Sequence, residues 1–409
     1  MLNATLGSYP NKVDPHSIVL QSVMTLYDWV KAERFLGWDP YDALNSELSR
    51  RITLGIPALE AVVTQFNRTS LVNLRPYLGV QKSIDTKGTA IFAQAFAQLY
   101  ELTEEARFKT DLKWCIELLE ERSLRNRYGF DCWSGHCYSH RLADLSMLDA
   151  QTAETVATSE VVMAFLDSIP IIGDDEQLRT IESAVNFLMD RMTIEKNDEM
   201  CFRYSTANES RIVINATAIA ISALSRASHY IESDRFRPII RRSVEFILRM
   251  QDEDGSWPYS VYDDGRTRSQ TDFHQGFLID GLIDCLPLFD GAEKARICTC
   301  IENAARFYAT KQFLSDGRGY YRYPRFYPTD IHNQAQGMIT LCKLTSISQD
   351  YARMANQVAI WTICNMQDST GYFWYRKGRL MTNKIKFMRW GQAWMMLALA
   401  KLLSNPGRV

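Results

Sequence analysis

The sequence of 409 residues predicts an all-α protein, an (α/α)6 toroid in which six helical hairpins close a ring, with short β turns at one rim. Apolar residues recur at helical spacing along most of the chain, and alternating stretches typical of strands are scarce. An aromatic, glycine-containing turn returns about every 60 residues, from roughly residue 85 onward. The last helix is strongly apolar, which favours a closed ring over an open stack of hairpins.

The repeated turn is clearest where it begins at Gln251, Gln312 and Gln367, and a degenerate copy lies at 201–204. A glutamine near a helix end can satisfy free carbonyl groups, and a glycine permits a left-handed cap. The aromatic side chain that follows can pack between hairpins. The run from Gln251 to Trp257 resembles the repeat motif of triterpene cyclases and related toroids, which implies a fold and not a function.

The helices can be paired along the chain. Inner helices, rich in small side chains, are expected to begin near residues 88, 152, 211, 271, 331 and 388. Outer helices, more charged on one face, are expected over 104–122, 174–192, 233–250, 292–310 and 349–366. The sixth outer helix is expected at 17–35 or 55–67. The chain is thus predicted to be one toroid domain over 1–409, with 1–84 as the N-terminal segment that closes the ring.

Composition excludes several classes of protein. The net charge is −2, and no Lys/Arg run predicts binding to nucleic acid or to anionic lipid. No signal peptide or transmembrane segment is predicted. Nine scattered cysteines without a CxxC pair indicate reduced thiols, so we expect a cytoplasmic protein. No metal and no cofactor is expected, because the Cys and His residues of 132–140 have no second cluster to complete a zinc site.

The segments that enter the inner helices are expected to line a central cavity. They are rich in Tyr, Trp, Asp, Asn, His, Arg and Lys. Aromatic rings cover the apolar faces of sugars, and Arg or Lys can neutralise a carboxylate or phosphate. We therefore expect an oligo- or polysaccharide as partner, free or lipid-linked.

Four segments, at 37–46, 73–76, 327–332 and 375–394, resemble α/α-toroid proteins of bacterial and archaeal surface-polysaccharide gene clusters. This resemblance implies a glycan context and partners in a biosynthetic complex. The run 321–336 is similar in layout to the catalytic toroid of glucuronyl C5-epimerases, in which tyrosines exchange the C5 proton of a hexuronate. The counterparts that this second resemblance implies are Tyr262, Tyr321 and Tyr327, followed by His332.

The predicted function is a carbohydrate-active enzyme of surface polysaccharide or glycan biosynthesis. It would act by acid–base chemistry on a uronate-containing glycan, as a C5-epimerase or a lyase. Such chemistry requires a base, an acid and cations that hold the developing enediolate charge. The catalytic candidates are Tyr327, Tyr321, His332, Asp330, Tyr262 and His274. The substrate-binding candidates are Trp38, Asp39, Asp42, Trp257, Asp263, Arg266, Arg325, Gln336, Lys384, Arg389 and Trp390.

Two alternatives remain open at this point. A glycoside hydrolase would need two carboxylates across the scissile bond, and Asp263 or Asp264 with Asp330 or Asp39 would supply them. A non-catalytic toroid that binds glycans or serves as a scaffold would need no titratable groups close to one bond.

Overall fold

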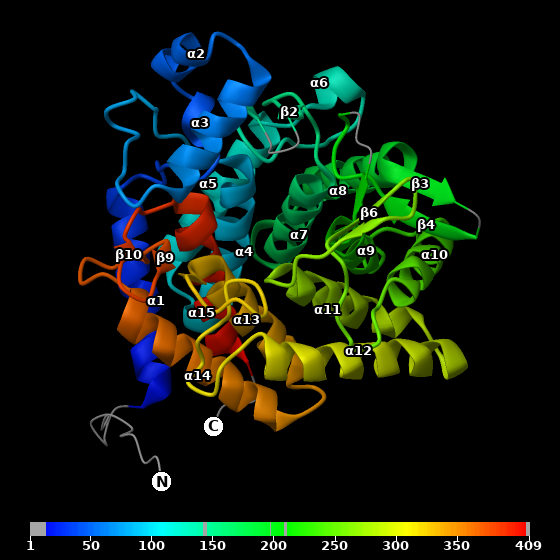
Figure 1. Ribbon diagram of the computed structural model, residues 1–409. Helices are drawn as coiled ribbons and strands as arrows, with labels where there is room; N and C mark the ends of the chain where they lie inside the picture. The colour runs from blue at the N-terminus through cyan, green and yellow to red at the C-terminus, as the bar shows by residue number, and fades with distance from the viewer. Residues whose placement is uncertain (1–13, 142–144, 197, 208–210, 406–409) are drawn as a thin grey trace.

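The computed structural model describes residues 14–141, 145–196, 198–207 and 211–405. Six inner helices follow one another around a ring, each packed on the next, and the last packs on the first (Figure 1). They are α4 (Thr86–Thr103), α7 (Thr155–Ile172), α9 (Ile214–Ala227), α11 (His274–Cys285), α13 (Ile331–Leu344) and α15 (Trp394–Ser404). The predicted (α/α)6 toroid is therefore confirmed.

The outer helices are α5 (Ala106–Glu121), α8 (Asp175–Phe187), α10 (Phe236–Arg249), α12 (Gly291–Lys311), α14 (Gln349–Met366) and α1 (Pro15–Ala32). Helix α1 packs on α14 and α15, so it is the sixth outer helix. Of the two segments predicted for that place, the one at 17–35 is correct. The other forms α3 (Pro57–Thr69), which lies with α2 (Glu47–Thr53) at the rim.

Among the described residues, four small antiparallel sheets lie in the segments between an outer helix and the next inner helix. Their strands are β1 (His140–Arg141) with β2 (Met147–Leu148), β3 (Thr193–Lys196) with β4 (Glu199–Phe202), β5 (Arg211–Val213) with β6 (Ser260–Tyr262) and β7 (Thr267–Arg268), and β8 (Thr329–Asp330) with β9 (Arg376–Lys377) and β10 (Thr382–Asn383). The remaining helical pieces are α6 (Arg125–Tyr128), the 3-10 turns Asp42–Leu44 and Leu286–Leu288, and the π turns Leu188–Met192 and Met388–Ala393.

The repeated turns attach each hairpin to its neighbour. The Gln251 side-chain amide donates to the carbonyls of Gly255 (3.2 Å) and of Cys300 in the next outer helix (3.0 Å). Gly255 has φ +91°, and a Cβ there would lie 2.5 Å from the carbonyl oxygen of Asn303. Only glycine therefore lets the turn approach α12 so closely. Gln367 makes the equivalent pair of hydrogen bonds, one of them to α1.

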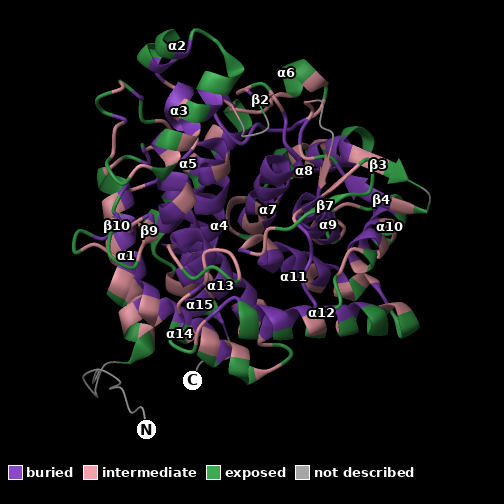
Figure 2. Cartoon of the chain, in the orientation of Figure 1, coloured by how far each residue is buried: buried purple, intermediate pink, exposed green. Residues whose placement is uncertain are grey.

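The inner helices are mostly buried, as Figure 2 shows. Among the described residues one helix, α7, is long and apolar enough to cross a membrane, and 67% of that stretch is buried inside the ring. A helix packed on both sides needs apolar side chains all round, so the composition of α7 agrees with its inner place.

Candidate functional site

The N-terminal ends of the inner helices and the loops before them enclose a cavity of 970 Å³. Its wall includes the aromatic residues Tyr41, Tyr204, Tyr259, Tyr262, Phe273, Phe277, Tyr321 and Trp390, together with the histidines His136, His140, His274 and His332. The cations of the wall are Arg68, Lys87, Arg211, Arg268, Arg322, Arg376 and Arg389, and its acids are Glu154, Asp272 and Asp330. Positive charge therefore exceeds negative charge around this space.

The structure brings several predicted site residues together here. The catalytic candidates in the wall are Tyr262, His274, Tyr321, Asp330 and His332, and the binding candidates are Arg389 and Trp390. Each comes from a segment that enters an inner helix, as expected from the repeat. Their roles stay predictions.

One predicted catalytic residue, Tyr327, is not in the wall. Its hydroxyl accepts a hydrogen bond from Arg318 (2.7 Å). Arg325, also predicted, is exposed and donates to the backbone carbonyl of Tyr327 (3.1 Å). The difference from Tyr321 arises because the loop turns back on itself between the two tyrosines, where the backbone of Tyr321 pairs with that of Arg325.

Two predicted binding residues lie in the core instead. Trp257 is 1% exposed, and its indole N–H donates to the carbonyl of Ile247 at 2.9 Å. Gln336 is fully buried and donates to Asp280 at 2.8 Å. Both side chains are buried and hydrogen-bonded within the core, so neither is free to touch a ligand.

Three more candidates lie on the outer surface. Asp263 and Arg266 are exposed in the turn between β6 and β7, and Arg266 pairs with its neighbour Asp264 (2.7 Å). Lys384 is exposed and lies over the ring of Trp374, 4.2 Å from its centroid. The structure places none of the three in the wall of the cavity, so the carboxylate pairs that the hydrolase alternative built on Asp263 or Asp264 are not assembled.

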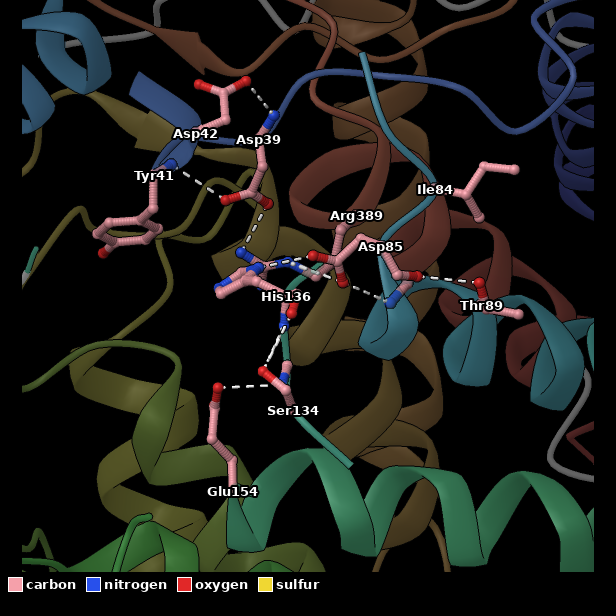
Figure 3. A network of polar contacts seen from close by, with 12 residues as sticks. Asp39, Tyr41, Asp42, Ile84, Asp85, Thr89, Ser134, His136, Glu154 and Arg389 are labelled. Carbon is pink, nitrogen blue, oxygen red and sulfur yellow. Dashed lines mark hydrogen bonds and ion pairs between the residues drawn. The ribbon is translucent and has the colours of Figure 1, made fainter. Parts of the chain in front are cut away.

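The loop 37–46 supports the wall from behind. Asp39 forms an ion pair with Arg389 (2.6 Å), which also lies 3.5 Å from Asp85 (Figure 3). Asp42 pairs with the buried Arg75 at 2.7 Å. Trp38, the third candidate in this loop, donates its indole N–H to a backbone carbonyl and pairs through its backbone with the segment that leads to Arg389.

His136 completes this network through its Nδ1, which lies 2.6 Å from Asp85. Burial alone would lower the pKa of His136, but the Asp85 carboxylate and its hydrogen bond outweigh burial and raise that pKa above its usual value. Ligand atoms of Asp39, Asp85 and His136 lie within 4.8 Å of one another, as in a metal site. The guanidinium of Arg389 already contacts both carboxylates and supplies the positive charge that a metal would bring.

A second histidine–aspartate pair faces the cavity at the start of α11. Asp272 lies 2.5 Å from Nδ1 of His274, and its other oxygen accepts from Gln270 (2.8 Å) with Arg322 3.6 Å away. An aspartate at Nδ1 fixes the tautomer and orientation of an imidazole, which leaves Nε2 to exchange a proton.

His332 lies beside this pair in an aromatic cage. Its ring centroid is 4.2 Å from Phe273, 4.7 Å from Trp390 and 4.8 Å from Trp394. Within the described part of the chain, neither ring nitrogen has a hydrogen-bond partner. Burial, with the positive charges of Lys87 and Arg389, lowers the pKa of His332 well below its usual value. Its imidazole is therefore neutral at physiological pH.

Phe273 stacks on His274 (4.1 Å) as well as on His332 (4.2 Å). The two histidines thus flank one phenyl ring at the edge of the cavity. Phe273 is not among the predicted residues, because a phenylalanine before an inner helix has the same local pattern as a core side chain.

Asp330 has a structural role in the wall. It accepts hydrogen bonds from Arg376 (2.6 Å), the indole of Trp390 (2.9 Å) and the backbone N–H of His332 (3.0 Å). Three donors thus fix the position of this carboxylate, which caps the N-terminus of α13.

The four segments that resemble surface-polysaccharide toroids meet at this wall. Asp42 pairs with Arg75, Asp330 pairs with Arg376, and the backbone N–H of Met388 donates to the carbonyl of Trp38 (3.1 Å). Segments far apart in the sequence therefore form one continuous structure around the cavity.

The cavity also contains residues that the predicted site omits, notably Arg68, Lys87 and Glu154. Arg68 lies on α3 and donates to the hydroxyl of Tyr41 (2.8 Å). Glu154 accepts from the backbone N–H of Gly135 (3.0 Å). Lys87 does belong to a rim segment, but only the fold shows that it faces the cavity.

No family model and no curated protein matches the sequence. Solved structures do match. The unsaturated glucuronyl hydrolase from Bacillus sp. GL1 aligns with a TM-score of 0.64 at 13% identity, over 94% of this chain and 96% of that one. A GH76 α-mannanase from Bacteroides thetaiotaomicron aligns with a TM-score of 0.64 at 10% identity, over 97% and 96%. The cellobiose 2-epimerase from Bacillus thermoamylovorans aligns with a TM-score of 0.61 at 11% identity, over 80% and 90%. At these identities the likeness shows a shared α/α-toroid fold.

Proposed function

We propose that this protein is a carbohydrate-active enzyme that transfers a proton at a carbon next to the carboxylate of a uronate, as an epimerase or a lyase. The observation that carries the proposal is the placement of His274 and His332 on the two faces of Phe273, beside a wall in which cations outnumber acids. The solved structures with this fold include sugar epimerases, an isomerase and glycoside hydrolases, which supports a sugar as substrate.

The positive wall favours an anionic sugar. Lys87 is half-buried at the cavity, and desolvation lowers the pKa of its ammonium group. A ligand carboxylate would supply a negative partner and so offset the cost of removing this charge from water. Arg376 and Arg322 lie over the ring of Tyr321, 5.0 and 5.3 Å from its centroid, where they can hold an enediolate as charge develops.

The two histidines have the properties that proton transfer needs. Asp272 orients His274 through its Nδ1, which leaves Nε2 of His274 to take a proton from carbon. His332 is neutral and has no partner at either nitrogen. It can therefore accept a hydrogen bond from a sugar hydroxyl or exchange a proton with one. Returning the proton to the other face gives an epimer, whereas loss of the 4-substituent gives an unsaturated product.

Hydrolysis is less well supported by the wall. Of its three carboxylates, Asp272 is engaged by His274 and Asp330 accepts from three donors. The pair of carboxylates that glycoside hydrolysis requires is therefore not available in suitable form.

The test is incubation of the protein with uronate-containing oligosaccharides in deuterated water. Deuterium at C5 in recovered sugar is expected for an epimerase, and an ultraviolet-absorbing unsaturated uronate for a lyase. New reducing ends without either product would show hydrolysis and contradict the proposal. Binding of the sugar without any product would support a scaffold instead.

A matched pair of variants locates the chemistry. His274→Gln is expected to lower the rate of exchange or elimination by roughly 10²- to 10⁴-fold, because a positioned acid–base group contributes about that much. His229→Gln is the control, since His229 is exposed and is not part of the cavity wall. Equal rates in the two variants would remove His274 from the mechanism.

A further inference from the structure

Helix α3 has its apolar face on the outside. Leu59, Val62 and Phe66, spaced as one face of a helix, are 43%, 62% and 60% exposed. The opposite face carries Thr64 and Asn67, which are buried. An ordinary surface helix buries its apolar side chains and exposes its polar ones. The order in α3 is reversed, and the cavity accounts only for Gln65 and Arg68, which line it.

The same reversal extends beyond α3. Of the seventeen large apolar side chains exposed in the described part of the chain, ten fall within residues 48–77: Leu48, Ile52, Leu54, Ile56, Leu59, Val62, Phe66, Leu71, Val72 and Tyr77. Single exposed apolar residues are normal, but a contiguous patch on a soluble domain marks a contact with another body. Figure 2 shows the exposed colour over α2 and α3.

The turn between β9 and β10 extends this patch from the other end of the chain. Leu380 is 93% exposed and Met381 is 61% exposed. The side-chain amide of Asn383, in β10, donates to the carbonyl of Ser70 at the end of α3 (2.8 Å), which joins the two segments. We call residues 47–82 and 376–386 together the rim patch.

Charge distinguishes between the bodies that could cover the rim patch. Its exposed cations are Arg50, Arg51, Lys82, Arg379 and Lys384, and its exposed acid is Glu47. Arg51 pairs with Glu47, and Lys82 pairs with Glu33 just outside the patch, so Arg50, Arg379 and Lys384 are its cations without an ion pair among the described residues. The second acid of the patch, Glu60, is buried and paired with Arg141 at 2.7 Å. Apolar side chains between basic ones are what an interfacial helix presents to a bilayer with anionic headgroups.

We propose that the rim patch docks this protein on the surface of an anionic lipid bilayer. Leu59, Val62 and Phe66 of α3 and Leu380 of the β9–β10 turn would enter the headgroup region, and the basic side chains would contact lipid phosphates. A second copy of this chain fits less well, because two such patches would bring like charges together.

Docking in this way would set the cavity at the membrane surface. Gln65 and Arg68, on the inward side of α3, are part of the cavity wall. The substrate would then be a saccharide held at the bilayer, such as one linked to a lipid. That last step rests on the proposed function, whereas the docking itself does not.

The experiment is flotation of the full chain with two kinds of vesicle, phosphatidylcholine alone and phosphatidylcholine mixed with phosphatidylglycerol. We expect binding to the mixed vesicles that weakens as salt is added. The variant Leu59→Gln/Val62→Gln/Phe66→Gln should bind at least about tenfold more weakly, since three apolar anchors are lost. Arg379→Glu/Lys384→Glu should also bind more weakly, by about tenfold.

The control is Tyr230→Gln/Ile347→Gln, which removes two exposed apolar side chains outside the rim patch. It should float like the unchanged protein. Circular dichroism shows whether each variant is still folded. Turnover of a soluble uronate shows whether the cavity still works when docking is lost. Absence of flotation, or equal flotation of all variants, would overturn the proposal. The proposal would also be overturned if light scattering showed a dimer that dissociates only in the α3 variant.

Discussion

Both ends of the inner ring hold charge that is partly shielded from water, and both hold ion pairs, such as Arg376 with Asp330 where the helices begin. Individual groups differ in whether they have a partner. Where the inner helices end, Lys343 on α13 lies 2.7 Å from both oxygens of Asp284 on α11, and Arg226 on α9 pairs with Asp167 on α7. Where the helices begin, Lys87 has no carboxylate within ion-pair distance among the described residues, and His332 has no partner at either nitrogen.

This difference separates Lys343 and Arg226, which are paired within the protein, from Lys87 and His332, which lie in the cavity wall without such a partner among the described residues. A charged pair that is complete within the protein contributes to the folded state, and breaking it leaves an uncompensated charge. A cation or imidazole without a protein partner costs stability and is retained where a ligand uses it. Mutations of the paired residues and of the residues without a partner should therefore have different effects on stability and on binding.

The largest contrast is expected between two lysines. Lys343→Met should lower the free energy of unfolding by about 3 kcal/mol, because Asp284 loses its partner. Lys87→Met should leave stability unchanged or raise it, since a desolvated and unpaired charge is removed. The same change should weaken binding of an anionic sugar about tenfold. Urea unfolding and titration calorimetry measure both quantities, and equal losses of stability would show that the two ends do not differ.

Two tyrosines of one loop give the next contrast. Tyr321→Phe should lower kcat/KM by roughly 10- to 100-fold, because Tyr321 faces the cavity beneath several guanidinium groups. Tyr327→Phe should lower it by less than about tenfold, since only the hydrogen bond from Arg318 is lost. If Tyr327→Phe lowered kcat/KM more than Tyr321→Phe, Tyr327 would be the catalytic tyrosine, as the likeness to glucuronyl C5-epimerases implies.

Two histidines should give opposite pH dependences of stability. The pKa of His332 is lowered from about 6.5, so below that pH the unfolded chain binds the proton and the folded one does not. Stability is therefore lost as pH falls below about 6.5. The pKa of His136 is raised, so its contribution is full below about 6.5 and is lost as pH rises through the folded pKa.

Each histidine changes the free energy of unfolding by about 1.4 kcal/mol for every pH unit between its pKa in the unfolded chain and its pKa in the folded protein. His332→Phe, which fits the aromatic cage, should remove the loss on the acid side, and His136→Gln the loss on the alkaline side. Urea unfolding at a series of pH values measures these effects. Profiles of both variants that follow the unchanged protein would contradict a neutral His332 and a raised pKa of His136.

The smallest effect is expected at the outer turn between β6 and β7. Asp263→Asn should change neither thermal stability nor turnover measurably, because this carboxylate is exposed and outside the cavity wall. A loss of activity in this variant would restore Asp263 to the site and favour the hydrolase alternative.

The helices can be predicted closely from the sequence because their signals are local. The repeat predicts the start of α13 at Ile331 directly, and α7 begins at Thr155, within one turn of the expected residue 152. The segments entering the inner helices are also the right place to look for the cavity. It is harder to predict which side chain of a segment faces the cavity. Trp257 and Phe273 have similar local patterns, but Trp257 is buried in the core and Phe273 lies in the cavity wall.

By itself the sequence determined the ring, because each hairpin of about 60 residues repeats its own helical pattern, glycine turn and glutamine. Tertiary structure decided which charges are paired. Arg389 reaches Asp39 and Asp85 only because the last helix packs on the first part of the chain. Closure also joins Asn383 to Ser70 and so assembles an apolar and basic surface that no single segment carries. Such contacts depend on distance in space, which local periodicity does not encode.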